Sequence, residues 1–414
     1  MTTKTDVAIV GAGAAGLAAA RELRALGVDH VVLEAKPVVG GRTISDEATF
    51  GFPYDLGGFW ISNDGDNFLV DAAERLGFDT SDQSFPGLEI PMLMDDRWET
   101  QAENSARLAF NDEAMATIGA FNPADPDRSI AEVAGTTSPW YPLLASWVGM
   151  LNGLPMERTS AVDQANLLHG ETVHQVPEGM GRLVQAWAGV PDVMVNTPVR
   201  AIDWNDAGVE LDVGDDVVTA RALILTASVG VLASDTISFA RTMPDRVREA
   251  LGYLPMGTVN RIAVQFDGDV FGETCPPSFG RFVSADDHIY IMTRLVGENV
   301  ALGYVGNELT LSLEQQPDDV AVDLLCDALA LGIGTDVRDR ITATLCTRWG
   351  SDPWSLGSYA AAEPGSAWAR AALQEPWDDR VFLAGEATSL TQFSLVHGAA
   401  NEGIRAARAA SAVL

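Results

Sequence analysis

The chain contains almost no lysine. Lys4 and Lys36 are its only lysines, so arginine supplies nearly all of the positive charge. Lysine and arginine together number 26 against 58 aspartates and glutamates, which leaves a formal net charge of −32 at pH 7. Such a charge excludes nucleic acid as an expected partner and disfavours an anionic membrane surface. The acids are spread along the whole chain, which favours solubility, with attraction of a cationic substrate as the alternative.

Cysteine and histidine are also scarce. Cys275, Cys326 and Cys346 are an odd number of cysteines without metal-site spacing, so we expect reduced thiols in a cytoplasmic protein. The five histidines form no close pair, and we predict no metal site. No apolar run reaches the roughly 18–20 residues that a membrane span needs. The N-terminus lacks the pattern of a signal segment. We therefore expect no membrane partner, and the oligomeric state stays open.

Glycine is plentiful, and its positions are informative. Residues 7–17, VAIVGAGAAGL, combine a short apolar run with a glycine-rich turn and the start of a helix. Gly11 permits a tight turn, Gly13 lets the backbone approach a pyrophosphate, and Gly16 allows close packing of helix and strand. The helix that begins at Ala14 would aim its N–H groups and partial positive charge at the phosphates.

Glu34 completes this pattern, because it ends the next apolar run at 34 − 16 = 18 residues after Gly16. A carboxylate at this place accepts the hydroxyls of a ribose, so the segment predicts a dinucleotide site. Two more glycine segments follow, VVGGR (38–42) and DLGGFW (55–60). The first, with Arg42, can reach the same phosphates, and the second offers backbone against which a flat ring could lie. A simple NAD dehydrogenase needs neither segment, which favours FAD.

The C-terminal part carries two further specific segments, TRWGSDPWSLGSYAAAEPG (347–365) and FLAGEAT followed by VHGAANEGIRAA (382–407). Together with GAGAAG, GGRT, DLGGFW and VPEGMGRL (176–183), they make the chain resemble the flavin-containing amine oxidase family. This family includes monoamine oxidases, polyamine oxidases and the flavin histone demethylases. The resemblance covers nearly the full length and is weakest around 61–170, where the family varies its substrate.

The resemblance implies FAD bound in extended form. Glu34 would hold the adenosine ribose, and Val199 would meet the adenine through its backbone. The helix beginning near Val396 would point its N-terminus at the flavin N1–C2 edge, where reduced flavin is anionic. The full set of expected cofactor-binding residues is Gly11, Gly13, Ala14, Gly16, Glu34, Gly41, Arg42, Gly57, Gly58, Phe59, Val199, Trp354, Gly385, Glu386, Leu395 and Val396.

For the reaction, the resemblance implies oxidation of a small or medium amine to an imine by hydride transfer to flavin N5, followed by reoxidation by O2 to give H2O2. Tyr359 would be the catalytic aromatic residue that holds the amine near the ring. A buried tyrosine that only packs beside a strand is the alternative. Ser358 stands where some members carry the cysteine that binds FAD covalently, so we expect non-covalent FAD. Leu395 stands where family members often carry a second aromatic residue beside the amine, so we expect an aromatic cage with one side only.

Arg261 occupies the position at which the family usually has a lysine that is water-bridged to flavin N5. We assign Arg261 a catalytic role as the cation at this place, since neither Lys4 nor Lys36 plausibly replaces that lysine. The electron acceptor is therefore O2 or another acceptor, and an FAD-dependent amine dehydrogenase is the nearest alternative. The sequence is also compatible with a flavoenzyme of the protoporphyrinogen-oxidase or carotenoid-desaturase type, with a flavin-dependent sugar mutase, and with a flavin-bearing scaffold that binds a partner protein.

The order of expected elements indicates an α/β fold with a Rossmann-type FAD-binding domain built from separated segments. We predict that this domain comprises residues 1–60, 179–235 and 350–414. An inserted α+β substrate-binding domain would comprise residues 61–178 and 236–349.

Several local elements follow from the hydrophobic patterns. Residues 66–78 predict a helix that buries Leu69, Ala72, Ala73 and Leu76, with Asp64 or Asp66 as its cap. The other predictions are strands within 193–225 and 258–305, a helix over 318–331, and a strand over 341–349.

Overall fold

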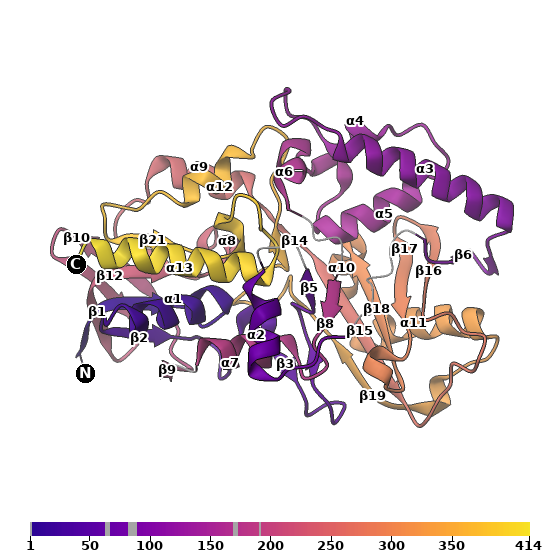
Figure 1. Cartoon of the computed structure of the whole chain (residues 1–414), viewed down its shortest axis with the longest axis horizontal. Helices are drawn as coiled ribbons and strands as arrows, with labels where there is room; N and C mark the ends of the chain where they lie inside the picture. The colour runs from indigo at the N-terminus through magenta and orange to yellow at the C-terminus, as the bar shows by residue number, and fades with distance from the viewer. Residues whose placement is uncertain (1, 63–66, 82–88, 169–172, 190–191) are drawn as a thin grey trace.

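The computed structural model describes residues 2–62, 67–81, 89–168, 173–189 and 192–414. Two sheets dominate it, one toward each end of an elongated molecule (Figure 1). Both chain termini lie at the end that holds the first sheet. Within the described ranges, none of the helices combines the length and apolar character required to cross a bilayer.

The first sheet joins strands from three separated parts of the chain. They are Thr2–Val10 (β1), His30–Leu33 (β2), Val193–Met194 (β9), Ala201–Asn205 (β10), Gly208–Asp212 (β11), Val217–Leu225 (β12), Ser238–Phe239 (β13) and Val381–Leu383 (β21). Their order is β13-β10-β11-β12-β1-β2-β9, and β21 pairs with the end of β12. The pairs of β1 with β2 and of β1 with β12 are parallel.

Parallel pairing brings the carboxyl ends of four strands to one edge of the first sheet. Val10 lies beside Leu33 of β2 and Leu225 of β12, and Leu225 also lies beside Leu383 of β21. Ligands of open α/β sheets bind in the crevice outside such carboxyl ends. The residues that directly follow these four strands are therefore placed to share one site, although they are hundreds of positions apart in the chain.

Helices cover both faces of this sheet. One face carries Ala14–Ala25 (α1), Met180–Ala188 (α7) and Val396–Ala412 (α13), and the other carries Val229–Leu232 (α8), Asp245–Tyr253 (α9) and Trp368–Leu373 (α12). Successive side chains of a strand point to opposite faces. Accordingly, Val7 and Ile9 enter the core under α1 and α13, while Ala8 and Val10 enter the core under α9 and α12.

The second sheet is built from the middle of the chain. Its strands are Met92–Met94 (β6), Arg97–Trp98 (β7), Val259–Phe266 (β15), Ser278–Ser284 (β16), Asp287–Met292 (β17), Val300–Gly306 (β18) and Ile341–Cys346 (β19). They lie in the order β19-β15-β18-β17-β16-β6-β7, mostly antiparallel. Ala263 and Tyr290 face one core of this half, and Ile262 and Ile291 face the other.

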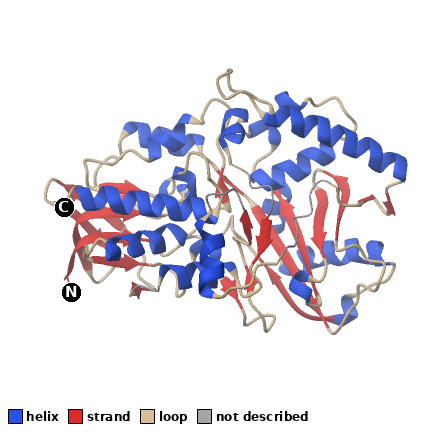
Figure 2. Cartoon of the chain, in the orientation of Figure 1, coloured by secondary structure: helices blue, strands red, loops and turns tan. Residues whose placement is uncertain are grey.

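Helices flank the second sheet as well (Figure 2). They are Gln101–Gly119 (α3), Ile130–Ala134 (α4), Tyr141–Asn152 (α5), Ala161–Asn166 (α6), Asn307–Glu314 (α10) and Asp318–Ile333 (α11). Short strand pairs connect the halves: Ser45–Asp46 (β3) with Tyr54–Asp55 (β4), Trp60–Ser62 (β5) with Val173–Gln175 (β8), and Met256–Gly257 (β14) with Tyr359–Ala360 (β20). The 3-10 turns are Gly41–Thr43 (η1), Met156–Arg158 (η2), Leu295–Gly297 (η3), Arg338–Arg340 (η4) and Glu386–Thr388 (η5).

The predicted helix near residue 70 is present, with two corrections. It spans Phe68–Leu76 (α2), and its cap is Asn67, whose side chain accepts a hydrogen bond from the Leu69 N–H. Asp64 and Asp66, the caps expected from the sequence, lie outside the described residues. Leu69 is buried as expected, but Leu76, the last residue of α2 before the Gly77 cap, is 45% exposed.

The expected domain limit at residue 235 precedes two elements that pack with the first sheet. β13 pairs with β10, and α9 contributes Val247, Ala250 and Leu251 to the core that also contains α12. The segment up to about residue 254 therefore belongs structurally with the first sheet. The reason is a strand pairing and a helix contact with residues far away in the chain, which local patterns do not indicate.

Candidate functional site

A cavity of about 350 Å³ lies between the two halves of the molecule. Its lining includes every sequence-predicted site residue except Gly16, namely Gly11, Gly13, Ala14, Glu34, Gly41, Arg42, Gly57, Gly58, Phe59, Val199, Arg261, Trp354, Tyr359, Gly385, Glu386, Leu395 and Val396. Trp354 is 37% exposed, so it lies at the open side of the cavity.

The turn after β1 forms one wall of the cavity. Gly11 has φ +98°, a backbone conformation that favours glycine, and a Cβ there would lie 2.4 Å from the Thr226 hydroxyl oxygen. Gly16 does not line the cavity but supports it, since a Cβ at Gly16 would lie 1.9 Å from the Gly11 carbonyl oxygen. A Cβ at Gly41 would lie 3.1 Å from the Gly13 Cα. The two glycine segments therefore pack directly against each other.

Glu34 lies at the end of β2 with a buried carboxylate. Its Oε2 accepts from the Ala12 N–H at 2.7 Å and its Oε1 from the Lys36 N–H at 2.8 Å. Each oxygen keeps capacity for a further hydrogen bond, which a ribose hydroxyl could donate. The Lys36 side chain forms an ion pair with Asp352 and lies 5.6 Å from the ring centre of Trp349.

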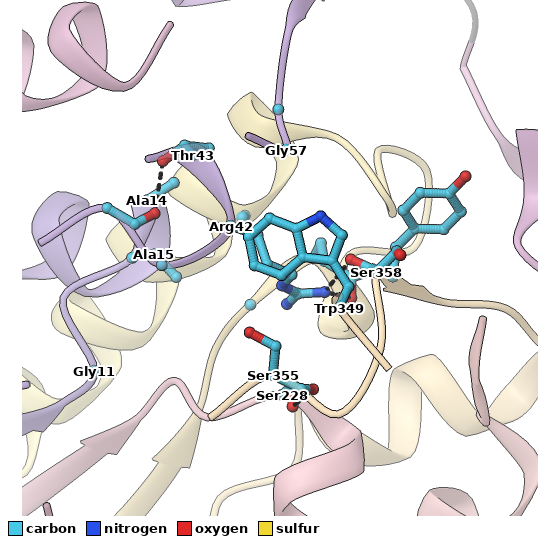
Figure 3. A pocket seen from close by; sticks show the side chains of 18 of the residues that line it. Gly11, Ala14, Ala15, Arg42, Thr43, Gly57, Ser228, Trp349, Ser355 and Ser358 are labelled. Atoms are coloured by element: carbon cyan, nitrogen blue, oxygen red, sulfur yellow. Dashed lines mark hydrogen bonds and ion pairs between the residues drawn. The ribbon is translucent and has the colours of Figure 1, made fainter. Parts of the chain in front are cut away.

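Arg42 joins three parts of the chain beside the cavity. Its Nη1 donates to the Ser358 carbonyl at 2.8 Å and to Glu386 Oε1 at 3.0 Å, and Figure 3 shows the guanidinium reaching toward Ser358. Glu386 Oε1 also accepts from the Ala360 N–H at 3.1 Å, and its Oε2 from the Ser394 N–H at 3.2 Å. This ion pair holds the η1, β20 and η5 segments around one space.

Tyr359 lies at the far end of the cavity. Its hydroxyl donates to the Met150 carbonyl at 2.9 Å, at the C-terminal end of α5, and burial raises the pKa of this phenol above its ordinary value. Ser358 is bound to β15, because its Oγ donates to the Val259 carbonyl and accepts from the Val259 N–H, both at 2.8 Å. The Ser358 hydroxyl is therefore engaged in backbone pairing.

Arg261 reaches the same end of the cavity from β15. It is 9% exposed, and its Nη1 donates to the Asp55 carbonyl at 2.7 Å. The guanidinium carbon lies 4.9 Å from the ring centre of Phe59 and 5.2 Å from that of Tyr304. Two aromatic faces and one carbonyl therefore hold this cation against the cavity.

Asp55 supports the wall behind Arg261. Its carboxylate accepts from the Ser45 hydroxyl, from the Met180 N–H at 2.8 Å and from the Gly181 N–H at 3.3 Å. Burial raises the pKa of this carboxyl to about 6, against the lowering effect of these hydrogen bonds and of the nearby Arg261 charge.

Sequence reasoning missed several lining residues, among them Thr226, Ser228, Tyr304, Trp349 and Ser355. Thr226 could have been found, because it directly follows the apolar strand β12, just as Gly11 follows β1 and Glu34 follows β2. No local signal marks Tyr304, which faces the site because it lies opposite Arg261 in the pairing of β15 with β18.

The lining fits a flavin dinucleotide in its distribution of donors and acceptors. Both long helices that begin at the cavity, α1 and α13, start without a side-chain cap and without an acid in the first turn. Their uncapped N–H groups therefore favour negative charge at two places. Glu34 supplies a hydrogen-bond acceptor at the end of the cavity where α1 begins. Gly57 and Gly58 add backbone without side chains to the lining.

Comparison with known proteins identifies the family. Residues 14–411 match the sequence profile described as flavin containing amine oxidoreductase, so the chain belongs to this family. Membership implies a flavin cofactor. Among relatives, Protein FLOWERING LOCUS D of Arabidopsis thaliana is 27% identical, with 98% of this chain and 55% of that protein covered. Polyamine oxidase 4 of Oryza sativa subsp. japonica is 28% identical, with 97% and 88% covered.

The chain spans about half the length of the first of these relatives and of the histone demethylase homologs that it matches. Among solved structures, a putrescine oxidase double mutant matches with a TM-score of 0.78 at 22% identity over 100% of both chains. Cyclohexylamine oxidase from Brevibacterium oxydans matches with a TM-score of 0.78 at 20% identity over 99% of both chains. The chain therefore has the α/β fold of these amine oxidases.

Proposed function

We propose that this chain is an FAD-dependent oxidase of a small or medium amine, which converts the amine to an imine by hydride transfer to flavin N5 and returns the electrons to O2 as H2O2. The observation that carries the proposal is one continuous cavity with a dinucleotide-type end at Glu34 and an aromatic, buried end at Tyr359. Such a cavity in a member of the amine oxidoreductase family supports oxidation of an amine.

Bound FAD would supply the hydride acceptor. The protein's own residues bind and orient: Glu34 accepts the ribose hydroxyls, and the N-terminus of α1 with Gly13 and Ala14 stabilises the phosphates. Arg42, neutralised in part by Glu386, adds a cation beside them. The N-terminus of α13 at Val396 stabilises negative charge at the opposite end of the cavity.

Tyr359 positions the amine. Its hydroxyl is held by the Met150 carbonyl, so the orientation of the ring is fixed before substrate enters. Leu395 and Phe59 add apolar lining, which keeps water away from the reacting carbon. Hydride loss from the neutral form of the amine needs no general base in the same step, so none is assigned among these residues.

We propose that FAD is bound without a covalent bond. Ser358 carries no thiol, and its hydroxyl pairs with the backbone of β15. The three cysteines are free and do not line the cavity, and free thiols also fit the cytoplasmic location expected from the sequence.

We further propose that residues 1–60, 179 to about 254 and 350–414 form the FAD-binding domain and that the remainder binds the amine. An FAD-dependent amine dehydrogenase is the second candidate. Arg261 favours it, because an arginine stands where the family usually has the lysine beside N5, and this change could slow the reaction with O2.

The test is a screen of amines against the purified flavoprotein without oxygen. The expected result is loss of the absorbance of oxidised flavin with at least one amine, followed by recovery in air together with H2O2. Recovery only with an added electron acceptor would support the dehydrogenase. Flavin that no amine bleaches, but that dithionite does, would contradict amine oxidation.

A further inference from the structure

Arg261 is a buried cation with unused hydrogen-bonding capacity. A guanidinium carries five N–H donors. Within the described residues, the Arg261 side chain makes one hydrogen bond, from Nη1 to the Asp55 carbonyl at 2.7 Å. The remaining donors belong to a side chain that is 9% exposed and lines the cavity.

The charge of Arg261 also has no carboxylate partner within the described residues. Asp55 offers it a backbone carbonyl, while the Asp55 carboxylate is occupied by Ser45 and by the N–H groups of Met180 and Gly181.

The described acids that line the cavity are engaged elsewhere. Glu386 is paired with Arg42, and both oxygens of Glu34 accept backbone N–H groups at the opposite end. Among the described acids, none that lines the cavity therefore pairs with Arg261, and the Asp55 carboxylate acts on its charge from outside the lining.

This arrangement has a consequence for the substrate. A buried guanidinium without an ion-paired carboxylate is costly, and a ligand that supplies one lowers that cost. The planar fork of a guanidinium matches a carboxylate in two parallel hydrogen bonds. A substrate with only an ammonium group would instead bring a second positive charge to this end.

We propose that Arg261 binds a carboxylate of the substrate, so that the preferred substrate is an amine that also carries an acid group, as an amino acid does. This inference rests on the proposed amine oxidation and names its substrate class. The position of Arg261 between Phe59 and Tyr304 fits this role, because the two rings hold the guanidinium without using its N–H donors.

The first experiment measures binding without turnover. The oxidised holoenzyme is titrated with benzoate and with benzyl alcohol, and the shift of the flavin absorbance is recorded. Benzoate should bind saturably and benzyl alcohol should not. In Arg261→Met, benzoate should bind roughly ten- to hundredfold more weakly, which corresponds to the loss of hydrogen bonds to a charged group.

Arg281→Met is the matched control. Arg281 lies on β16 of the same sheet, is ion-paired with Asp287 and does not line the cavity. It should bind benzoate like the wild type. Equal benzoate affinity in wild type and Arg261→Met would overturn the inference.

The second experiment uses matched substrate pairs in the wild type, so it needs no variant to fold. Anaerobic flavin reduction is followed with phenylalanine against phenethylamine and with leucine against isopentylamine. The amino acid of each pair should reduce the flavin more efficiently by roughly tenfold or more, and Arg261→Met should remove most of this preference. Faster reduction by the plain amines would overturn the inference but support amine oxidation. If no member of either pair reduces the flavin, the proposed reaction fails, and the benzoate titration still decides the role of Arg261.

Discussion

Tyr359 connects the two halves of the molecule through a single hydrogen bond. The residue lies on β20, which pairs with β14, and its hydroxyl contacts the end of α5, which packs on the second sheet. A Cβ at Gly153 would lie 3.0 Å from the Tyr359 ring, so this glycine lets the chain after α5 pass close to the ring. The ring is therefore held on several sides, as a side chain that positions substrate must be.

Tyr359→Ala should slow anaerobic flavin reduction roughly two- to thirtyfold, the loss of one cation–aromatic contact of about 0.5–2 kcal/mol. Tyr359→Phe keeps the ring and should stay closer to the wild-type rate. Stopped-flow absorbance measures both variants at equal FAD content. An unchanged rate in well-folded Tyr359→Ala would assign the residue to packing alone.

Arg261 should influence the return of electrons as well. Electron transfer to O2 creates a negative charge beside the flavin, and a nearby cation stabilises it. A broad guanidinium held by Phe59 and Tyr304 reaches this charge less freely than a lysine would. We expect reoxidation slower than reduction in the wild type, slower still in Arg261→Met, and faster in Arg261→Lys, measured by mixing the reduced enzyme with oxygenated buffer. If both variants reoxidise like the wild type, Arg261 has no role in this step.

Asp55 should make folding stability depend on pH. Its pKa rises from 3.8 to about 6 on folding, so the folded state binds this proton more tightly than the unfolded state. The contribution is fully present below about pH 4 and is lost as pH rises through about 6. The free energy of unfolding of the wild type should therefore fall by roughly 2 kcal/mol relative to that of Asp55→Asn between pH 4 and pH 6, and by roughly 3 kcal/mol over the whole titration.

Denaturant unfolding at several pH values measures this difference. Asp235→Asn, at an exposed site, is the control and should show no such trend. A pH-independent difference between wild type and Asp55→Asn would mean that Asp55 keeps an ordinary pKa in the folded protein.

The helices α1 and α13 form the close contact that holds the N- and C-terminal segments together (Figure 1). Small residues make it possible: a Cβ at Gly403 would lie 2.0 Å from the Ala15 carbonyl oxygen. Both helices begin at the cavity, so any shift between them also moves two of its walls.

Gly403→Ala should therefore lower the free energy of unfolding by about 1–3 kcal/mol, the cost of overpacking, and should weaken FAD retention. Gly252→Ala in α9 is the matched control, because no described atom outside its chain neighbours and its own helix backbone lies within 4 Å of the added Cβ. This variant should be neutral or stabilised by about 0.5–1 kcal/mol. Denaturant unfolding of both variants, with FAD content determined by absorbance, provides the comparison. Equal behaviour of the two variants would show that α1 and α13 separate without cost.

At the level of the whole molecule, FAD would be enclosed by segments that come together only in the folded state. Its release should then accompany unfolding. Acid precipitation of the holoenzyme should leave yellow FAD in the supernatant, because Ser358 offers no thiol and the three cysteines lie outside the cavity. Flavin absorbance of the supernatant and the pellet measures the division. Flavin retained by the pellet would show a covalent bond and contradict the prediction.

The sequence alone determined the features that depend on local backbone chemistry. A turn with φ +98° favours glycine, and an acid follows the next strand 18 residues after Gly16. Both residues can be read directly from the sequence. Periodicity similarly predicted strands within 258–305, where β15 spans Val259–Phe266, and a helix over 318–331, where α11 spans Asp318–Ile333. These elements follow from neighbours in the chain.

Only the tertiary structure decided which distant residues meet. Arg261 faces the cavity beside Tyr304 because β15 pairs with β18 in one particular register, and a shift of β15 by one residue would turn the Arg261 side chain to the other face. The same applies to Leu76, which the helical pattern places on the apolar face of α2 but which is 45% exposed in the folded chain. Long-range pairing is set by the packing of the whole core, so short stretches of sequence do not encode it.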